Sequence, residues 1–563
     1  MQRLRPILLI FLLFGCISPH ASTEANRDSV LAGLTRTPDI EKQSAEPGQE
    51  ATVEESSRKT LREQAEDFDR FLQGKLSVEE NAKIKNACND IPEKNPFCFS
   101  ILNYPYFTEK KEKLRKAENS PSKRIRRVNP SYRKGELANW TALRFAPPAA
   151  TISPMAGLRK ARFSHLKELA LRETECPLYI AISIAAALED QLPNKDSLGD
   201  IARLYEKGGN CIPEETPDDK ATTLTRAGLF QLLDNQPQKA YELFVRASNV
   251  PNAVNSRPLY WRHRMEKLLG KTHDAEKSLK QLSDKYPFSF HTVVAQAAIN
   301  ADPGSLLSQP HRDAKRSQLV PAINLLIEQV EILHKFGLEN SARTVLDWAV
   351  GESKDVEPEV KLYLAELKDQ KSEDHLKKIK LLADVLYDHP NLISKKSMEL
   401  YFPKPYFPVF EKHSSGLDPF LLLAIARQES AFNPQAVSSA NAVGLLQVVP
   451  QTGKKVTNAT KRALMKPETN IKTGSKYFQQ LLKKVGGQIH LAMAAYNAGP
   501  RKLKEWLGRY PTDDPILFID ILPYRETRDY VALVLRNYYW YRRMHGTEQE
   551  AREISKRVFD LQN

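Results

Sequence analysis

Apolar residues recur at helical spacing through most of the chain. Between about residues 155 and 395 they lie three and four positions apart, and short turns separate the segments. Examples are Ala227 to Leu233 with Ala240 to Ala247, and Tyr260 to Leu269 with Ala275 to Leu282. Gly270 follows one of these segments as a helix C-terminal cap would. Paired helices that repeat about every 34 residues predict a degenerate, tetratricopeptide-like α-superhelix.

The signals for β-strands are nearly absent, because no long apolar–polar alternation is bounded by Asn-Gly or Asp-Gly turns. We therefore expect an all-α fold. Two prolines and three aromatic residues near Leu400 to Tyr406 predict a non-helical link to a C-terminal domain. The predicted organisation is an export signal over 1–22, a flexible linker over 23–60, an N-terminal helical region over 61–150, the superhelix over 151–398, the C-terminal domain over 399–545 and a tail over 546–563.

The amino-acid composition argues against some classes of protein function. The chain has 563 residues, of which 41% are hydrophobic, so a folded chain is expected over most of its length. Only 23 residues are glycine, which argues against Gly-rich nucleotide-binding loops. Lys and Arg number 83 against 69 Asp and Glu, and the formal net charge of +14 predicts a polyanionic neighbourhood.

The N-terminus has the pattern of an export signal. Arg3 and Arg5 precede a short apolar run from Ile7 to Phe14. The run ends at Leu13-Phe14-Gly15-Cys16, which resembles the lipobox of bacterial lipoproteins, so Cys16 is a lipidation candidate. Ordinary cleavage near Ala21 is the alternative.

Cysteine parity agrees with export. If Cys16 carries lipid, four cysteines remain, an even number that suits disulfides in an oxidising compartment. The most local pairing joins Cys88 to Cys98 and Cys176 to Cys211, although four cysteines allow three connectivities. Free buried thiols are an equally open alternative. No C-x-x-C pair occurs, so we expect no metal site.

One carboxylate stands out after residue 400. Asp418 and Pro419 have the pattern of a helix start, and Leu422, Ile425 and Glu429 then share one helix face. Glu429 therefore lies on an apolar stripe close to a helix C-terminus. Burial and the negative end of the helix both favour its protonated form. A raised pKa is what a general acid at neutral pH requires, although a buried structural Glu is the commoner case.

Three further segments carry polar residues in apolar surroundings. Gln447 is a lone amide in an apolar run after Gly444, and a buried amide needs a partner from the protein or from a ligand. Tyr496 ends a short helix that begins at Ile489. Glu526 opens a tyrosine-rich helix, where its charge would suit the first turn.

These segments together resemble, in order and spacing, the soluble lytic transglycosylase family. The matching motifs are Glu429-Ser430, Gly444-Leu445-Leu446-Gln447, Ala495-Tyr496-Asn497-Ala498-Gly499 and Glu526-Thr527-Arg528-Asp529-Tyr530-Val531. Four motifs in order within about 100 residues are specific. Leu446 stands where the family usually has Met, a near-isosteric exchange. The resemblance implies a superhelical domain followed by a lysozyme-like catalytic domain over 399–545.

The resemblance also implies a reaction. The family cleaves the glycan strand of peptidoglycan between N-acetylmuramic acid and N-acetylglucosamine, and the sugar's own C6 hydroxyl attacks C1 to give a 1,6-anhydro end. No cofactor is needed. By carry-over Glu429 is the single acid and base, and the substrate-binding candidates are Ser430, Ser438, Gln447, Tyr496, Asn497 and Glu526. Glu526 is also the fallback second carboxylate that a hydrolase would need.

Two alternatives stay open. One is a goose-type-lysozyme-like muramidase that lets water attack, and the other is a non-catalytic helical scaffold that binds peptidoglycan. The expected location is the periplasm, with anchoring to the outer membrane through Cys16 as one option and cell-wall synthesis proteins as candidate partners of the helical domain. We expect no nucleic-acid binding, since an export signal is present and aromatic–basic interleaving is not.

Overall fold

The structure, a computed structural model, describes residues 60–89, 95–109, 180–192, 197–299, 320–352, 356–371 and 375–547, together with isolated positions elsewhere. The predicted export signal with Cys16, nearly all of the linker and Cys176 lie outside these residues. The fold is all-α, as predicted. Within the described ranges, sheet-like pairing is limited to two isolated bridges, between Val437 and Val443 and between Val443 and Val448. No helix in the described part is long and apolar enough to cross a membrane.

The chain forms two compact units. One contains Ser153–His311 and Asp374–Asn563, and the other contains Arg312–Glu373 together with the described residues before position 110. This division differs from the predicted order of domains, in which 151–398 was one continuous superhelix. The described helices between Pro321 and Lys371 group with the N-terminal helices instead, and long-range side-chain contacts establish that pairing.

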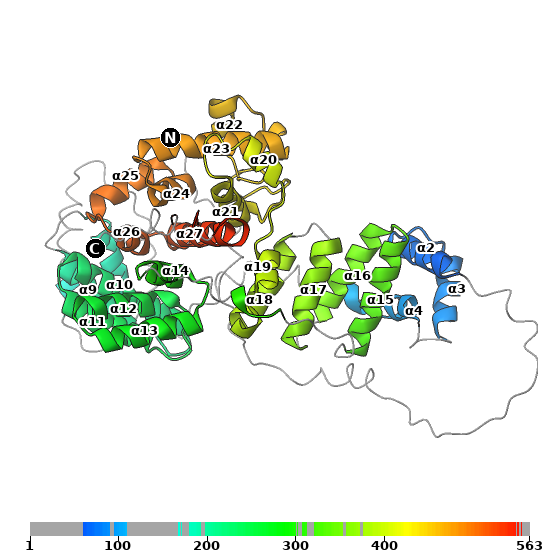
Figure 1. Ribbon diagram of the computed structural model, residues 1–563, viewed down its shortest axis with the longest axis horizontal. Coiled ribbons are helices and arrows are strands. Elements are labelled where there is room, and N and C mark those ends of the chain that lie inside the picture. Colours follow the sequence, from blue (N-terminus) through cyan, green and yellow to red (C-terminus); the bar gives the residue numbers. More distant parts are fainter. Residues whose placement is uncertain are drawn as a thin grey trace, which may run out of the picture. The chain divides into compact units, whose positions relative to one another are not determined.

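The described part of the second unit includes six complete helices. They are α2 (Leu61–Leu72), α3 (Val78–Asn89), α4 (Pro96–Leu102), α15 (Pro321–Lys335), α16 (Glu339–Glu352) and α17 (Pro358–Lys371). Figure 1 shows α15 and α16 side by side with α4 against α15. Aromatic rings fill the core: Phe107 stacks on Trp348 with the ring centroids 4.8 Å apart, and Phe68 lies 5.5 Å from Phe97. These rings explain why the N-terminal helices join α16.

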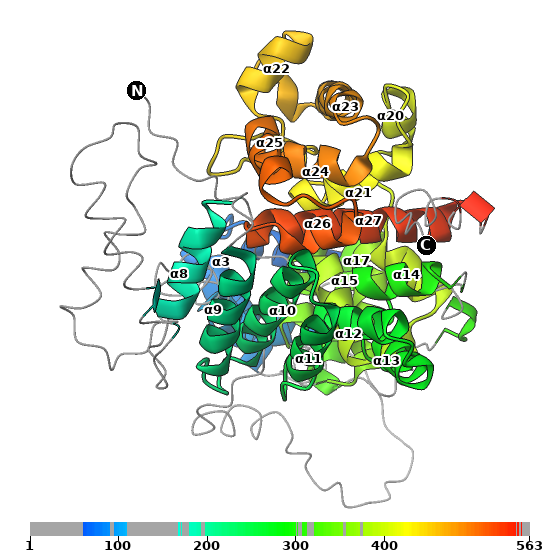
Figure 2. The same cartoon turned by 90° about the vertical axis from the view of Figure 1, so that its left-hand side faces the viewer.

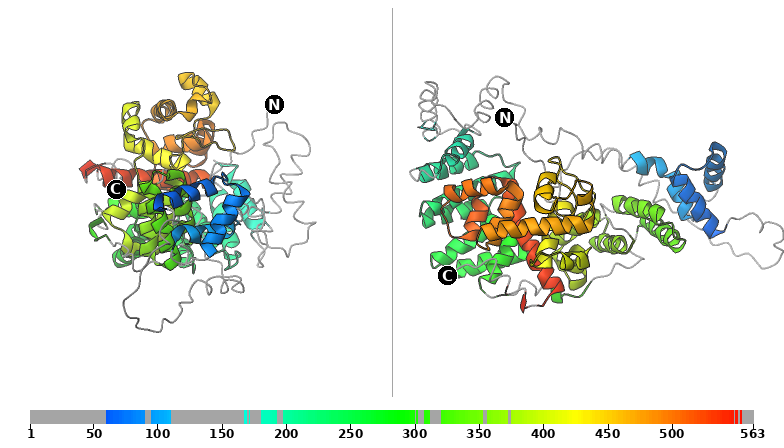
Figure 3. Two further views of the ribbon diagram at one scale, coloured as in Figure 1. Left: turned by 90° about the vertical axis from the view of Figure 1, so that its right-hand side faces the viewer. Right: turned by 90° about the horizontal axis from the view of Figure 1, so that it is seen from above.

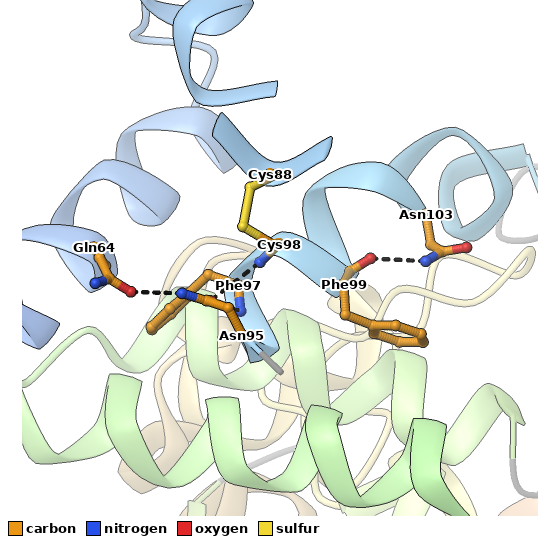
Figure 4. The surroundings of a disulfide bond; sticks show 7 residues. All are labelled: Gln64, Cys88, Asn95, Phe97, Cys98, Phe99 and Asn103. Carbon is orange, nitrogen blue, oxygen red and sulfur yellow. Dashed lines mark hydrogen bonds between the residues drawn. A yellow bond between two sulfur atoms is a disulfide. The ribbon is translucent and has the colours of Figure 1, made fainter. Parts of the chain in front are cut away.

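A disulfide between Cys88 and Cys98 ties α3 to α4 (Figure 4). Beside it, the Asn95 side chain caps α4 by accepting from the backbone N–H of Phe97 at 2.9 Å, and its Nδ2 donates to Gln64 Oε1 at 2.8 Å. Cys211 in the first unit is also disulfide-bonded. Its predicted partner, Cys176, lies outside the described residues.

The first unit begins with a row of helices in which each packs on the next. They are α8 (Ile180–Glu189), α9 (Leu198–Asn210), α10 (Pro217–Leu233), α11 (Pro237–Ser248), α12 (Ser256–Leu268), α13 (Thr272–Lys285) and α14 (Phe290–Ala297). Gly270 takes φ +69° after α12, as its predicted capping role requires. A Cβ on Gly228 would lie 2.5 Å from the Phe244 ring, so α10 and α11 approach closely. We call this row, α8 to α14, the repeat helices.

The C-terminal domain follows α18 (His375–Asp388), the 3-10 helix η6 (Pro390–Leu392) and α19 (Lys395–Tyr401). Because α19 extends to Tyr401, the non-helical link is shorter than predicted. The domain comprises α20 (Phe407–Lys412), α21 (Pro419–Ser430), α22 (Pro450–Thr457), η7 (Ala463–Met465), α23 (Pro467–Lys484), α24 (Ile489–Ala498), α25 (Pro500–Arg509), α26 (Pro515–Ile521) and α27 (Arg525–His545).

Helix α27 is the central element of the first unit. It packs against α21 and α24 of the C-terminal domain and also against α14 and α19. Figure 2 shows it between the helices of the C-terminal domain and the repeat helices, and the view from above in Figure 3 shows helices of the C-terminal domain lying over it. Its side chains are correspondingly buried on several faces, including Tyr530, Tyr539 and Trp540.

Candidate active site

Helix α21 brings Glu429 into the interior. Asp418 caps its start by accepting from the Phe420 backbone N–H at 2.9 Å, and Arg542 of α27 donates to the same carboxylate at 2.6 Å. The helix ends where Ala431 takes the left-handed conformation, at φ +47°. All residues from Phe420 to Glu429 are buried, not only the predicted stripe. The helix is therefore enclosed on every side, and Glu429 lies in its last turn.

Arg427 fixes this helix against the preceding link. Its guanidinium lies 4.4 Å from the ring centroid of Tyr401 and 4.6 Å from that of Phe402, and it donates a hydrogen bond to the Tyr401 carbonyl. Stacking of this kind holds a buried cation without a carboxylate partner. The carboxylate of Glu429, two residues on, thus faces elsewhere.

The Glu429 side chain is an acid held in a dry environment. The residue is 5% exposed, and burial raises the pKa of its carboxyl to about 8. The Tyr530 hydroxyl beside it lowers this pKa in part, and the charge of Glu526 raises it further. The apolar stripe of Leu422 and Ile425 predicts that Glu429 is buried. The two neighbours on α27 come from almost 100 residues later in the chain.

The loop between α21 and α22 is folded by backbone hydrogen bonds. Ser438 and Ala442 pair at 2.9 Å, and the Gly444 N–H donates to the Ala436 carbonyl at 2.9 Å. Gly444 has φ +78°, and a Cβ there would lie 2.6 Å from the Leu464 carbonyl oxygen. The position therefore requires glycine for both its conformation and its space.

Asn470 of α23 also holds this loop in place, through three hydrogen bonds. Its Nδ2 donates to the carbonyls of Val443 and Leu464, each at 2.7 Å, and its Oδ1 accepts from the Leu446 N–H at 2.8 Å. Asn470 is fully buried. Sequence reasoning missed this residue, because an asparagine inside a helix gives no sign that its amide will meet a loop about 25 residues away.

Gln447 presents an amide at the end of this loop. Its Nε2 donates to the carbonyls of Gly444 at 2.9 Å and Ala436 at 3.2 Å. Its Oε1 is buried and has no hydrogen-bond partner within the described part of the chain. Gln447 also has φ +44°, a conformation that costs free energy in a residue with a side chain. The free acceptor is thus held in a fixed place.

The two serine candidates differ in what they bind. The Ser430 hydroxyl donates to the Leu445 carbonyl at 2.9 Å, so it joins α21 to the loop. Ser438 accepts from the Ala442 N–H at 3.0 Å through its oxygen, and its own hydroxyl proton stays available. Ser430 is thus engaged in the protein's structure, whereas Ser438 can still donate to a ligand.

Helix α24 contributes Tyr496 and Asn497 at its end. The Tyr496 hydroxyl donates to the Leu446 carbonyl at 2.7 Å, and burial and the charge of Glu429 raise the pKa of this phenol well above its usual value. Asn497 Oδ1 accepts from Thr527 Oγ at 2.7 Å. The Asn497 side chain also lies beside Glu526. Burial raises the pKa of Glu526, and the Asn497 amide lowers it in part.

The start of α27 closes the site with Glu526 and Tyr530. They are four residues apart and so lie on the same helix face. The pKa of Glu526 is raised, chiefly by burial, although the side chain is only half-buried. Tyr530 is buried, and its hydroxyl makes no hydrogen bond of standard geometry among the described residues. Sequence reasoning did not single out Tyr530, although its spacing from Glu526 was a usable signal.

Side chains of α21, α24 and α27 meet around Glu429, and the loop before α22 is bonded to α21 through Ser430 and to α24 through Tyr496. Glu429, Tyr496, Glu526 and Tyr530 influence one another electrostatically. The arrangement offers a protonated acid at neutral pH, a second carboxyl close by and several fixed hydrogen-bonding groups. Among the described residues no group of three His, Cys, Asp or Glu side chains could hold a metal ion.

Comparison with known proteins shows what this domain is similar to. Residues 409–519 match the family described as Transglycosylase SLT domain. The soluble lytic murein transglycosylases of Salmonella typhimurium and Escherichia coli K12 are each 35% identical, over 181 and 175 residues. These alignments cover 30% and 29% of this chain and 26% of each relative, so the chain matches about a quarter of the length of these relatives. A membrane-bound lytic murein transglycosylase F of Histophilus somni is 38% identical over 127 residues, which is 20% of this chain and 26% of that protein.

Solved structures share the fold over a longer stretch. The lytic transglycosylase Slt of Pseudomonas aeruginosa, in an inactive mutant, aligns with 87% of this chain and 98% of its own chain at a TM-score of 0.50 and 17% identity. At this identity the likeness concerns the fold. It extends the similarity from the C-terminal domain to the helical region before it.

Proposed function

Because residues 409–519 match the family described as Transglycosylase SLT domain, we propose that this protein is a peptidoglycan lytic transglycosylase. The proposed substrate is the glycan strand, cut between N-acetylmuramic acid and N-acetylglucosamine with formation of 1,6-anhydro ends. The observation that carries the proposal is Glu429, an acid whose pKa burial raises to about 8. It stands among the residues that the family motifs place around the reacting sugar.

In the proposed reaction Glu429 acts first as an acid and then as a base. Its proton goes to the glycosidic oxygen as the bond to C1 breaks. The C6 hydroxyl of the same sugar then attacks C1 and gives its proton to the Glu429 carboxylate. The acid is thereby regenerated, and no water is consumed. A pKa near the operating pH suits both transfers.

Around the acid, free hydrogen-bonding atoms support substrate binding. The Gln447 Oε1 can accept from a sugar hydroxyl or an acetamido N–H, and the Ser438 hydroxyl can donate. Tyr496 and Asn497 are proposed to border the acetamido group, and Glu526 to bind a sugar hydroxyl. Ser430 is proposed to act through the loop, because its hydroxyl is bound to the Leu445 carbonyl.

Hydrolysis is the second candidate, and one observation favours it. Glu526 lies close enough to Glu429 for its charge to raise the Glu429 pKa. A second carboxylate at such a site is what an inverting or retaining glycosidase uses to activate water or to form a covalent intermediate.

Digestion of purified sacculi tests both candidates. Wild-type protein and Glu429→Gln are incubated with sacculi, and the masses of the released muropeptides are measured by mass spectrometry. We expect ends that lack one water relative to hydrolysed ends, and no cleavage by Glu429→Gln. Glu411→Gln, which alters an exposed carboxylate of the same domain, is the matched control. Only reducing ends would establish hydrolysis, and full activity of Glu429→Gln would remove Glu429 from the reaction.

We propose the periplasm as the site of action, because the curated relatives are named for murein. Anchoring through Cys16 and partners among cell-wall synthesis proteins remain part of this proposal. Growth in labelled palmitate, followed by purification of the wild type and Cys16→Ser, tests the anchor. Label in the wild type alone supports it, and label in neither refutes it.

A further inference from the structure

A buried carboxylate connects the C-terminal domain to the repeat helices. Asp520, near the end of α26, has a fully buried side chain. Its oxygens accept from Arg257 Nε at 2.6 Å, from Trp261 Nε1 at 2.7 Å and from His291 Nε2 at 3.0 Å. All three donors belong to α12 and α14. We call Asp520 and these three donors the Asp520 cluster.

The cluster is charged and internally satisfied. Burial alone would raise the pKa of Asp520, but the Arg257 guanidinium and His291 hold it below its usual range, so the carboxylate is ionised. Burial lowers the pKa of His291. The neutral ring must donate from Nε2, because a carboxylate only accepts, and its Nδ1 therefore accepts from the Ser256 hydroxyl at 3.0 Å.

Arginine side chains also bind the backbone that follows Asp520. The Ile521 carbonyl accepts from Arg226 of α10 at 3.1 Å, and the Leu522 carbonyl accepts from Arg528 at 2.8 Å. Arg257 also reaches Asp529 at 3.4 Å. The segment from Asp520 to Asp529, which contains the start of α27, is therefore fixed by side chains of the repeat helices.

The same turns of α27 carry two groups of the candidate site. Glu526 and Tyr530 face Glu429. Arg528 lies two residues from each, about 200° around the helix, and so points away from them. A displacement of this helix start toward or away from α12 must therefore move both neighbours of Glu429.

We propose that Asp520 is a positioning residue for the reaction: through Arg257, Trp261 and His291 the repeat helices hold the first turns of α27, and with them Glu526 and Tyr530, against Glu429. The inference rests on the proposed function. It assigns the repeat helices a part in the chemistry without contact to the substrate. Its physical basis is the attraction between the Asp520 carboxylate and the positively charged side chains near it. Loss of the Asp520 carboxylate removes one of the two carboxylates, Asp520 and Asp529, that offset the positive charges of Arg257 and the buried Arg528, and burial together with the charge of Arg257 already lowers the Arg528 pKa.

The test is Asp520→Asn, which keeps the shape of the side chain and removes its charge. We expect kcat for glycan cleavage to fall at least tenfold with KM changed less than threefold. We also expect the alkaline limb of the kcat–pH profile to move to lower pH, because water that enters beside a loosened α27 reduces the burial of Glu429. Asp190→Asn is the matched control. It breaks the 2.8 Å pair with Arg509, which also joins a repeat helix to the C-terminal domain, but through an exposed carboxylate.

Hydrogen exchange supplies a readout that does not depend on activity. Amides of Thr527 to Val531 should exchange faster in Asp520→Asn than in the wild type, and at wild-type rate in Asp190→Asn. If Asp520→Asn does not fold, Trp261→Phe carries the test, since it removes one hydrogen bond and keeps the charges. We expect a two- to fivefold loss of kcat and a smaller shift of the profile in the same direction, because one of the hydrogen bonds to Asp520 is lost while its carboxylate and Arg257 remain.

Unchanged exchange and an unchanged pH profile in a folded variant would overturn the inference. So would an equal loss of kcat in Asp190→Asn, because the effect would then belong to the interface in general. Failure of the proposed function appears differently: the wild type itself would not cleave sacculi, while the exchange rates would still decide whether Asp520 holds α27.

Discussion

Replacing Glu429 by Gln should make the protein more stable at neutral pH while it abolishes cleavage. Burial raises the pKa of Glu429 from 4.5 to about 8 in the folded protein. In the unfolded chain water solvates the carboxylate, so its pKa is near the ordinary value. The folded state therefore binds the proton more tightly. The stability that this proton contributes is complete below pH 4.5 and is lost as the pH rises to 8.

The magnitude follows from the two pKa values. Each pH unit between 4.5 and 8 costs the folded state about 1.4 kcal/mol. Gln does not titrate, so the stability of Glu429→Gln relative to the wild type should grow with pH. Taking pH 4 as the reference cancels any constant effect of the amide. The gain should then be roughly 3 kcal/mol at pH 7 and approach about 5 kcal/mol above pH 8.

Urea unfolding at pH 4, 6, 7 and 8.5 measures this difference. Trp506 and Trp540 are buried in the C-terminal domain, so tryptophan fluorescence reports its unfolding. Glu411→Gln is the control, since it alters an exposed carboxylate that water solvates in both states. A difference between Glu429→Gln and wild type that stays constant within about 1 kcal/mol over this pH range would refute the argument that burial keeps Glu429 protonated.

Three further predictions concern other parts of the structure. Tyr530→Phe removes the hydroxyl that lowers the Glu429 pKa, so the alkaline limb of the kcat–pH profile should move to higher pH, by roughly half a unit to one unit; an unmoved or lowered limb would contradict it. Asn470→Ala removes three buried hydrogen bonds, among them those of the Leu464 carbonyl and the Leu446 N–H, and should cost about 2–4 kcal/mol in urea unfolding, with Asn458→Ala, at an exposed helix end, as the control expected to cost less than half of this. Removing the Cys88–Cys98 disulfide by a double substitution to Ala opens a short loop and should destabilise the second unit by about 3 kcal/mol, seen as faster proteolysis there, while glycan cleavage stays within twofold; a large loss of cleavage would contradict it.

The capping signals and helical spacing predicted which local elements carry the candidate site residues. Glu429 could be placed near the end of a buried helix because Asp418 and Pro419 mark the start and the apolar spacing marks the face. Tyr496 and Glu526 could be assigned to a helix end and a helix start for similar reasons. These are local signals, since capping and periodicity act over a few residues.

Other features could not be predicted because they depend on contacts between distant segments. The three hydrogen bonds of Asn470 reach a loop about 25 residues away, and the three donors to Asp520 come from more than 200 residues earlier. The packing of 312–373 with the N-terminal helices is of the same kind. The periodic spacing of apolar residues does not indicate which helix faces will pack against each other.

The sequence by itself determined the helices and their caps and predicted which carboxyl group would lie buried near a helix end, because a helix forms from interactions between residues three and four positions apart. The tertiary structure alone decided the pKa of that acid. Only when α27 packs against α21 do Tyr530 and Glu526 come within range of Glu429 and water leave its surroundings. Charge and burial act through space, and the distances that govern them are set by packing and not by position in the chain.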